Sequence, residues 1–134
     1  MREPAPPKLR EYKLPGGFRL LAGRTDEDNE RLSLKIARAN DWWFHVRGMP
    51  GSHVVLVADP EIGEPGKDVL KMAAAVAAYH SRARGGGVVP VSATLAQYVS
   101  KPRGAKTGTV EIRKETVFKV RPALPPGYED TERG

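Results

Sequence analysis

The first third of the chain combines short apolar runs with turn residues. Tyr12–Leu14 and Phe18–Leu21 flank Pro-Gly-Gly, which predicts a β-hairpin. The acids within Asp26–Asn29 suit the first turn of a helix. Apolar residues then recur at helical spacing up to Asn40, namely Leu32, Ile36 and Ala39. We therefore expect a hairpin followed by a short amphipathic helix.

A second hairpin is predicted in the middle of the chain. Trp42–Val46 and His53–Val57 are rich in β-forming residues and are joined by Gly48–Gly51. Strict alternation gives the first strand an apolar face, which indicates core: Trp42, Phe44 and Val46. Its other face carries Trp43, His45 and Arg47. We expect this second face to be exposed and to contact RNA.

The longest predicted helix is Lys67–Arg84, which Gly85-Gly86-Gly87 ends. One stripe of it consists of Val69, Met72, Ala73, Val76 and His80, and its many alanines indicate close packing on a sheet. Val88–Val91 predicts a buried strand. Thr109–Ile112 and Thr116–Val120 predict a final hairpin.

These elements predict an α+β fold, a single domain of hairpin-connected strands with two main helices packed on the sheet. A chain of 134 residues is long enough to form such a domain without crosslinks. We expect it to comprise residues 11–121. The proline-rich residues 1–10 and the Pro-Pro-Gly and charged segment 122–134 are expected to form a flexible arm and tail.

The positive charge of the chain is clustered. The net charge is +6, and most acids lie between Asp26 and Asp68 or at the ends. Residues 69–110 contain no acid but hold Lys71, Arg82, Arg84, Lys101, Arg103 and Lys106. Such a cluster favours binding to a nucleic acid, and a solvated charged face is the alternative.

Cysteine is absent, which excludes disulfides, zinc–thiolate sites and thiol nucleophiles and suits a reducing cytoplasm. The N-terminus lacks the apolar run of a signal peptide, and the longest apolar stretch, residues 72–79, is too short to span a bilayer. We expect a cytoplasmic protein without a membrane partner.

The block Asp41–Val54 holds two tryptophans, a phenylalanine and two histidines around a Gly/Pro turn. Aromatic faces stack on bases and imidazoles donate to phosphates, so the block predicts an RNA-recognition surface. Its candidate RNA-binding residues are Trp43, His45, Arg47, Ser52 and His53. Asp41 is expected to brace the turn by accepting backbone hydrogen bonds, and Pro50 and Gly51 are expected to shape it.

The basic segment Lys101–Gly108 is a second candidate contact with RNA. Its glycines, Gly104 among them, let backbone amides approach a phosphate, and Lys101, Arg103 and Lys106 add charge. It is not a Walker loop, because no Gly-Lys-Ser/Thr sequence opens a helix. The alternative is a surface turn with exposed bases.

Enzymatic and metal-binding roles have less support. His45, His53 and His80 are potential metal ligands, but no carboxylate or cysteine lies at ligand spacing. A hydrolase built on a histidine and Ser52 lacks any sequence feature that would position an acid and a base around the nucleophile. We therefore expect no catalytic residues, no metal and no cofactor.

The motifs occur in a distinctive order: Leu21-Ala-Gly-Arg24, Asn29, Leu32-Ser-Leu-Lys35, Asp41-Trp-Trp-Phe-His-Val46, Pro50-Gly-Ser-His-Val54, Ala77-Ala-Tyr79 with Ser81, Val89-Pro-Val91 and Lys101–Gly108. Over about residues 18–121 this order resembles the NFACT-R domain, the RNA-binding module of NFACT proteins. Full-length NFACT proteins act in ribosome-associated quality control, where they bind the large subunit and recruit tRNA to extend the stalled chain.

The resemblance implies a non-enzymatic RNA-binding module with tRNA or rRNA as ligand and the large ribosomal subunit as a candidate partner. The other domains of NFACT proteins are not recognised in the sequence, so we expect the chain to resemble stand-alone bacterial members rather than to synthesise tails alone. Bacterial relatives also carry a fibronectin-binding label, which nothing in these residues supports. The alternative function is a protein-interaction module that docks through the aromatic turn on a ribosomal or quality-control protein. The sequence predicts no oligomeric state.

Overall fold

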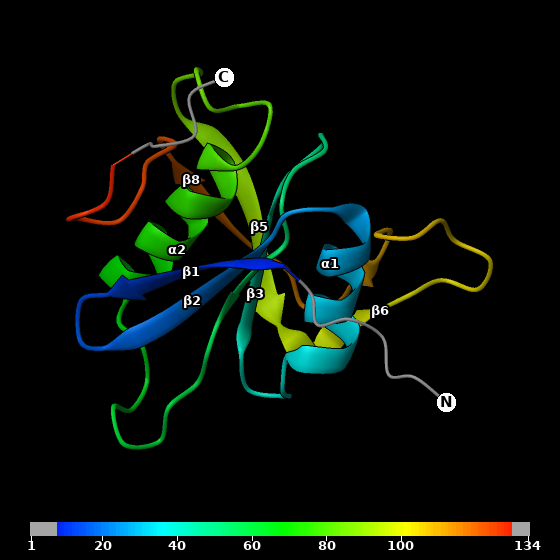
Figure 1. Ribbon diagram of the computed structural model, residues 1–134, viewed down its shortest axis with the longest axis horizontal. Helices are drawn as coiled ribbons and strands as arrows, with labels where there is room; N and C mark the ends of the chain where they lie inside the picture. The colour runs from blue at the N-terminus through cyan, green and yellow to red at the C-terminus, as the bar shows by residue number, and fades with distance from the viewer. Residues whose placement is uncertain (1–7, 130–134) are drawn as a thin grey trace.

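The computed structural model describes residues 8–129, which are built around a six-stranded sheet (Figure 1). The strands lie in the order β1-β2-β4-β3-β5-β8, and each pair of neighbours is antiparallel. Their bounds are Leu9–Leu14 (β1), Phe18–Gly23 (β2), Trp42–Val46 (β3), Val54–Leu56 (β4), Val89–Leu95 (β5) and Thr116–Val120 (β8). The first two predicted hairpins are therefore confirmed as β1–β2 and β3–β4.

Helix α2, Lys67–Tyr79, packs on one face of this sheet (Figure 1). Its buried alanines permit a close approach, and Phe44 of β3 shares the first core cluster with them. The prediction that the helix reaches Arg84 is wrong. The helix ends at Tyr79, because the Ser81 hydroxyl donates to the Ala78 carbonyl and Ser81 forms an isolated β-bridge with a distant glycine.

The opposite face of the sheet is covered by three short helical segments and a two-stranded sheet. Their bounds are Asp26–Arg31 (α1), Leu32–Ile36 (the π-helical turn η1), Ala96–Tyr98 (the 3₁₀ turn η2), Val99–Ser100 (β6) and Glu111–Ile112 (β7). Thr25 caps α1 by accepting a hydrogen bond from the Asp28 N–H. The helical segment ends at Ile36, short of the predicted Asn40, because Ala37 is extended.

Both faces of β3 are therefore covered, and alternation along this strand does not separate core from solvent. Phe44 and Val46 are buried, and Phe44 lies in the α2 core. Trp43 lies in a second core cluster with Leu21, Leu32 and Val55 and is only 3% exposed. The prediction that Trp43 presents an exposed ring is wrong, because α1, η1 and the β6–β7 sheet cover that face. Trp42 is half-buried against the first cluster.

The predicted hairpin of residues 109–112 with 116–120 is also wrong, because the two segments join different sheets. β7 pairs with β6, whereas β8 pairs with β5. Ile112 packs against the second core cluster and Phe118 belongs to the first. Lys114, between them, adopts a left-handed φ of 55°.

The described fold extends beyond the predicted range 11–121. β1 begins at Leu9, the Ala123 N–H donates to the Ala75 carbonyl, and the Lys13 N–H donates to the Tyr128 hydroxyl. The predicted flexible arm and tail lie partly outside the described residues, at 1–7 and 130–134. The fold class, a single α+β domain, is confirmed. Within residues 8–129 no helix has the length and apolarity needed to span a membrane.

Candidate nucleic-acid interface

The turn between β3 and β4 is held against the segment that follows α2. Gly51 forms a β-bridge with Ser81, and the Ser52 N–H donates to the His80 carbonyl at 2.9 Å. A Cβ atom on Gly51 would lie 2.8 Å from the Ser81 Cβ, so a larger residue requires movement. Gly48 has a φ of +78°, which reverses the chain direction at low cost. The Pro50–Ser52 segment is thereby fixed beside the end of α2.

A buried hydrogen-bond chain connects Trp43, Ser33 and His53. The indole N–H donates to Ser33 Oγ at 2.8 Å, and the Ser33 hydroxyl lies 2.7 Å from His53 Nδ1. Because Ser33 Oγ already accepts the indole proton, its own proton is available to Nδ1, which assigns the imidazole proton to Nε2. The three residues are each less than 5% exposed. Trp43 and His53 thus tie η1 to β3 and to the start of β4 through Ser33.

Burial disfavours the charged form of the two histidines in the block Asp41–Val54. Burial lowers the pKa of His53 to about 4; repulsion from the His45 imidazolium, when that ring is protonated, adds to this shift, and hydrogen bonds with backbone groups oppose it. Burial also lowers the pKa of His45. The two rings lie edge to face with centroids 5.2 Å apart. His53 is only 4% exposed, and its contact with a phosphate stays a prediction.

Two side chains tie the start of β4 to α1 and β2. The His53 N–H donates to Asn29 Oδ1 at 3.0 Å, and the Ser52 hydroxyl donates to the Gly23 carbonyl at 2.7 Å. A Cβ on Gly23 would lie 2.0 Å from Asn29 Oδ1, so this close approach requires glycine. Ser52 therefore uses its hydroxyl proton within the protein, and only its oxygen lone pairs can accept from a ligand.

The loop formed by residues 101–110 folds back onto α1 through Glu30. The Lys101 ammonium lies 2.9 Å from Glu30 Oε1, and the Gly108 N–H donates to the same oxygen at 3.0 Å. The Gly108 N–H and Lys101 lower the pKa of the Glu30 carboxyl. Lys101, which the sequence suggested as a phosphate contact, thus anchors the loop.

The rest of this loop is more accessible. Gly104 has a φ of +77° and is the third residue of a turn in which the Ala105 N–H donates to the Pro102 carbonyl. Arg103 and Lys106 are exposed on either side of it. Each provides a cation at the surface, and neither has an ion pair within residues 8–129.

Two pockets meet at Pro50 and Gly51, and Asp26 and Asn29 line both. The histidine pocket has a volume of about 420 Å³, and the residues that line it include Trp43, His45, His53, Lys106 and Gly108. The arginine pocket has a volume of about 400 Å³, and the residues that line it include Arg10, Arg24, Ser52, His80, Arg82 and Arg84. Because they share these four residues, the two pockets are adjacent, and we refer to them together as the concave surface around the turn.

Positive charge dominates the arginine pocket, where four arginines face a single acid, Asp26. Arg84 packs over the Tyr79 ring at 4.1 Å and donates to the Tyr79 carbonyl. The guanidinium groups of Arg24 and Arg82 are exposed and have no hydrogen bond or ion pair within residues 8–129. They are therefore available to an external anion.

Residues 8–114 match the family described as the NFACT protein RNA binding domain. This match covers well over half of the chain. The chain belongs to the NFACT-R family. The predicted resemblance is thereby confirmed, and it includes the Pro50–Ser52 turn, the 101–110 loop and both pockets.

This NFACT-R domain is similar to the Rqc2 homolog RqcH of Bacillus subtilis, with 37% identity over 118 residues that cover 87% of this chain and 20% of that protein. RqcH of Streptococcus suis is 36% identical over 103 residues, which are 77% of this chain and 18% of that protein. The chain thus spans about a fifth of the length of these curated relatives.

A solved structure shares the fold. It is the C-terminal part of the fibronectin/fibrinogen-binding protein from Streptococcus suis, with a TM-score of 0.80 and 32% identity. The match covers 92% of this chain and 48% of that chain.

Some predicted site residues of the NFACT-R domain lie outside the two pockets. Arg47 is exposed, and its Nε lies 3.8 Å from a carboxylate oxygen of Glu115. Arg103 lines neither pocket. Asp41 is buried and accepts hydrogen bonds from the N–H groups of Arg38 and Ala58, which brace the entry to β3.

The three histidines that are potential metal ligands lie in two different pockets. Within residues 8–129 no group of three His, Asp or Glu side chains could hold a metal ion. His45 and His53 line the histidine pocket, whereas His80 lines the arginine pocket and its Nε2 lies 2.6 Å from the Tyr12 hydroxyl. The three histidines are therefore not brought together as one ligand set.

Sequence reasoning missed the two available arginines. Arg82 was one base among several in the acid-free segment, and Arg24 only part of the motif Leu21–Arg24. Neither position is near Pro50–Ser52 in the sequence, and only the packing of the β2 and α2 ends brings all three together. The acid-free basic segment 69–110 indicated an anion-binding surface, but the sequence did not show where on the fold that surface lies.

Proposed function

We propose that this NFACT-R domain binds structured RNA, tRNA or large-subunit rRNA, on the concave surface around Pro50–Ser52. The observation that carries the proposal is a pair of guanidinium groups, those of Arg24 and Arg82, which have no partner in the described part of the chain and lie beside a fixed turn. Phosphate contacts from arginine position RNA, and their charge supplies most of the salt-sensitive affinity.

The two pockets support different contacts. In the arginine pocket Arg24 and Arg82 pair with successive phosphates. In the histidine pocket the half-buried, neutral His45 ring offers an apolar face and a hydrogen-bonding edge to a nucleotide, while Lys106 pairs with phosphate at the rim. Arg103 extends the basic surface along the loop.

The proposed process is ribosome-associated quality control in the cytoplasm. Its support is the family membership and the similarity to proteins named Rqc2 homolog RqcH. The chain spans about a fifth of the length of those relatives, so we do not propose the activity of the whole relatives for it. We propose for this chain only the RNA-binding step, with the large ribosomal subunit as its partner.

We propose further that the domain acts without catalysis of its own. The Ser33 hydroxyl, which contacts His53, is buried, and its oxygen accepts a hydrogen bond from the Trp43 indole N–H. A nucleophile needs access to substrate and an oriented base, and the buried Ser33 hydroxyl lines neither pocket. The Ser52 hydroxyl donates to a backbone carbonyl instead of a histidine.

The test is binding of fluorescently labelled tRNA by Arg24→Gln/Arg82→Gln and by the control Lys67→Gln/Lys71→Gln, which removes two exposed charges from α2. We expect the arginine pair to weaken binding about tenfold and to reduce the slope of log K against log salt by about 1.4 to 1.8, because two phosphate contacts are lost. The control should leave both nearly unchanged. Equal effects of the two double variants would show that binding depends only on the total charge, and they would overturn the proposed site.

A further inference from the structure

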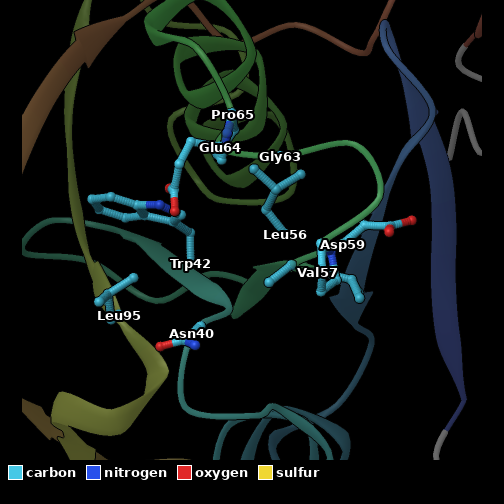
Figure 2. A pocket seen from close by; sticks show the side chains of 11 residues that line it. Asn40, Trp42, Leu56, Val57, Asp59, Gly63, Glu64, Pro65 and Leu95 are labelled. Atoms are coloured by element: carbon cyan, nitrogen blue, oxygen red, sulfur yellow. The ribbon is translucent and has the colours of Figure 1, made fainter.

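A third pocket lies at the other end of β3 from the Pro50–Ser52 turn. It has a volume of about 520 Å³ and is bounded by Trp42, the start of β3, and by the connection between β4 and α2. Figure 2 shows the Trp42 indole on one side, with Leu95 below it and Leu56 opposite. None of its lining residues lines the arginine or histidine pocket. It is a separate site.

Trp42 gives this pocket an aromatic wall with an available donor. The residue is half-buried, and its ring packs beside Phe44 with centroids 6.3 Å apart. Within residues 8–129 the indole N–H has no hydrogen-bond partner, and it is not sealed from solvent. Half-buried tryptophans with a free N–H are typical binding anchors, because they combine a large apolar area with one directional bond.

The charge around Trp42 is opposite to that of the rest of the molecule. The connection 57–66 carries Asp59, Glu61 and Glu64 and no base, in a chain with a net charge of +6. None of the three carboxylates has an ion pair within residues 8–129. Asp59 and Glu64 line the pocket together with Trp42, and Figure 2 labels all three. A phosphate would be repelled here, and a cation would be attracted.

We propose that this pocket docks a basic segment of another protein. An arginine or lysine side chain stacks on the Trp42 ring and pairs with Glu64, and a neighbouring apolar residue packs on the half-buried Leu95. A cation over an indole face is stabilised by the ring quadrupole, and a guanidinium also pairs with a carboxylate through two hydrogen bonds. The domain then holds RNA at one end of β3 and a basic protein segment at the other. This docking site is independent of the proposed RNA site.

The experiment pans a phage-displayed octapeptide library against the full chain and measures the selected peptides, after synthesis, by fluorescence anisotropy. We expect selection of peptides with arginine or lysine beside an apolar residue. Their binding should fall at least about tenfold in Trp42→Ala and in Glu64→Lys. Glu111→Lys, an equal charge reversal at an exposed residue of β7, should leave it unchanged. Because Trp42 also packs on the core, the exposed Glu64 variant keeps the test valid if Trp42→Ala does not fold.

The bound site is located from NMR spectra of the labelled chain. The selected peptide should shift the Trp42 indole N–H signal and the amides of residues 57–66, and it should bind Arg24→Gln/Arg82→Gln normally. Selection without basic residues, or shifts confined to the arginine pocket, would overturn the proposal. A mixture of the four 5′-mononucleotides is tested in parallel. If it shifts the Trp42 indole signal and the peptides do not, the pocket binds a nucleobase and the proposal is wrong.

Discussion

Ser33→Ala tests the buried hydrogen-bond chain between Trp43 and His53. The substitution removes a single hydroxyl and leaves two buried groups, the Trp43 indole N–H and His53 Nδ1, without their partner. Each unpaired buried group costs about 1–3 kcal/mol, so two cost about 2–6 kcal/mol. Because both rings line the histidine pocket, water can approach, and we expect the free energy of unfolding to fall by about 2–4 kcal/mol.

Urea unfolding followed by tryptophan fluorescence measures this change. The control is Ser100→Ala at an exposed residue of β6, which should alter stability by less than about 0.5 kcal/mol. Folded Ser33→Ala should bind RNA within about twofold of the parent chain, because Ser33 lines neither pocket. A loss of stability below about 1 kcal/mol, or a loss of RNA affinity without a loss of stability, would refute the structural role of the Trp43–Ser33–His53 hydrogen bonds.

Three further predictions concern titration, packing and the basic loop. The pKa of His53 is about 4 in the folded state and 6.5 in the unfolded state, so His53 contributes about 3 kcal/mol to the free energy of unfolding above pH 6.5, and this contribution is lost as the pH falls toward 4. In urea unfolding at pH 7 and pH 4, His53→Gln should lose less stability between the two pH values than the parent chain. An equal loss in both proteins would contradict this prediction. Gly51→Ala should cost about 1–3 kcal/mol in urea unfolding because its Cβ meets Ser81, whereas Gly85→Ala, in open space, should be nearly neutral; equal effects would show that the turn moves freely. Glu30→Gln should speed amide exchange in the 101–110 loop and weaken RNA binding, and unchanged exchange would show that Glu30 is not the anchor.

Local pattern predicted most of the sheet and both helices. The Pro-Gly-Gly and Gly-Met-Pro-Gly sequences located the two hairpins, and the alanine-rich stripe located α2. These features depend on neighbours in the sequence. The end of α2 at Tyr79 does not, because it is set by the bridge between Ser81 and Gly51, about thirty residues apart.

The orientation of Trp43 was mispredicted for the same reason. Alternation correctly separates it from Phe44, but whether its face meets solvent depends on α1, η1 and the β6–β7 sheet. The partner of β8 likewise depends on a crossing at Lys114 that no local motif marks. Long-range packing therefore decided which motif residues are structural.

The central claim, RNA binding around Pro50–Ser52, is tested most directly by ultraviolet crosslinking of the tagged protein in cells, with sequencing of the bound RNA and mapping of the crosslinked peptides. We predict tRNA or large-subunit rRNA joined to peptides that contain Arg24, His45, Arg82 or Lys106. Crosslinks at background level, or RNA joined only to the acidic connection 57–66, would contradict the account.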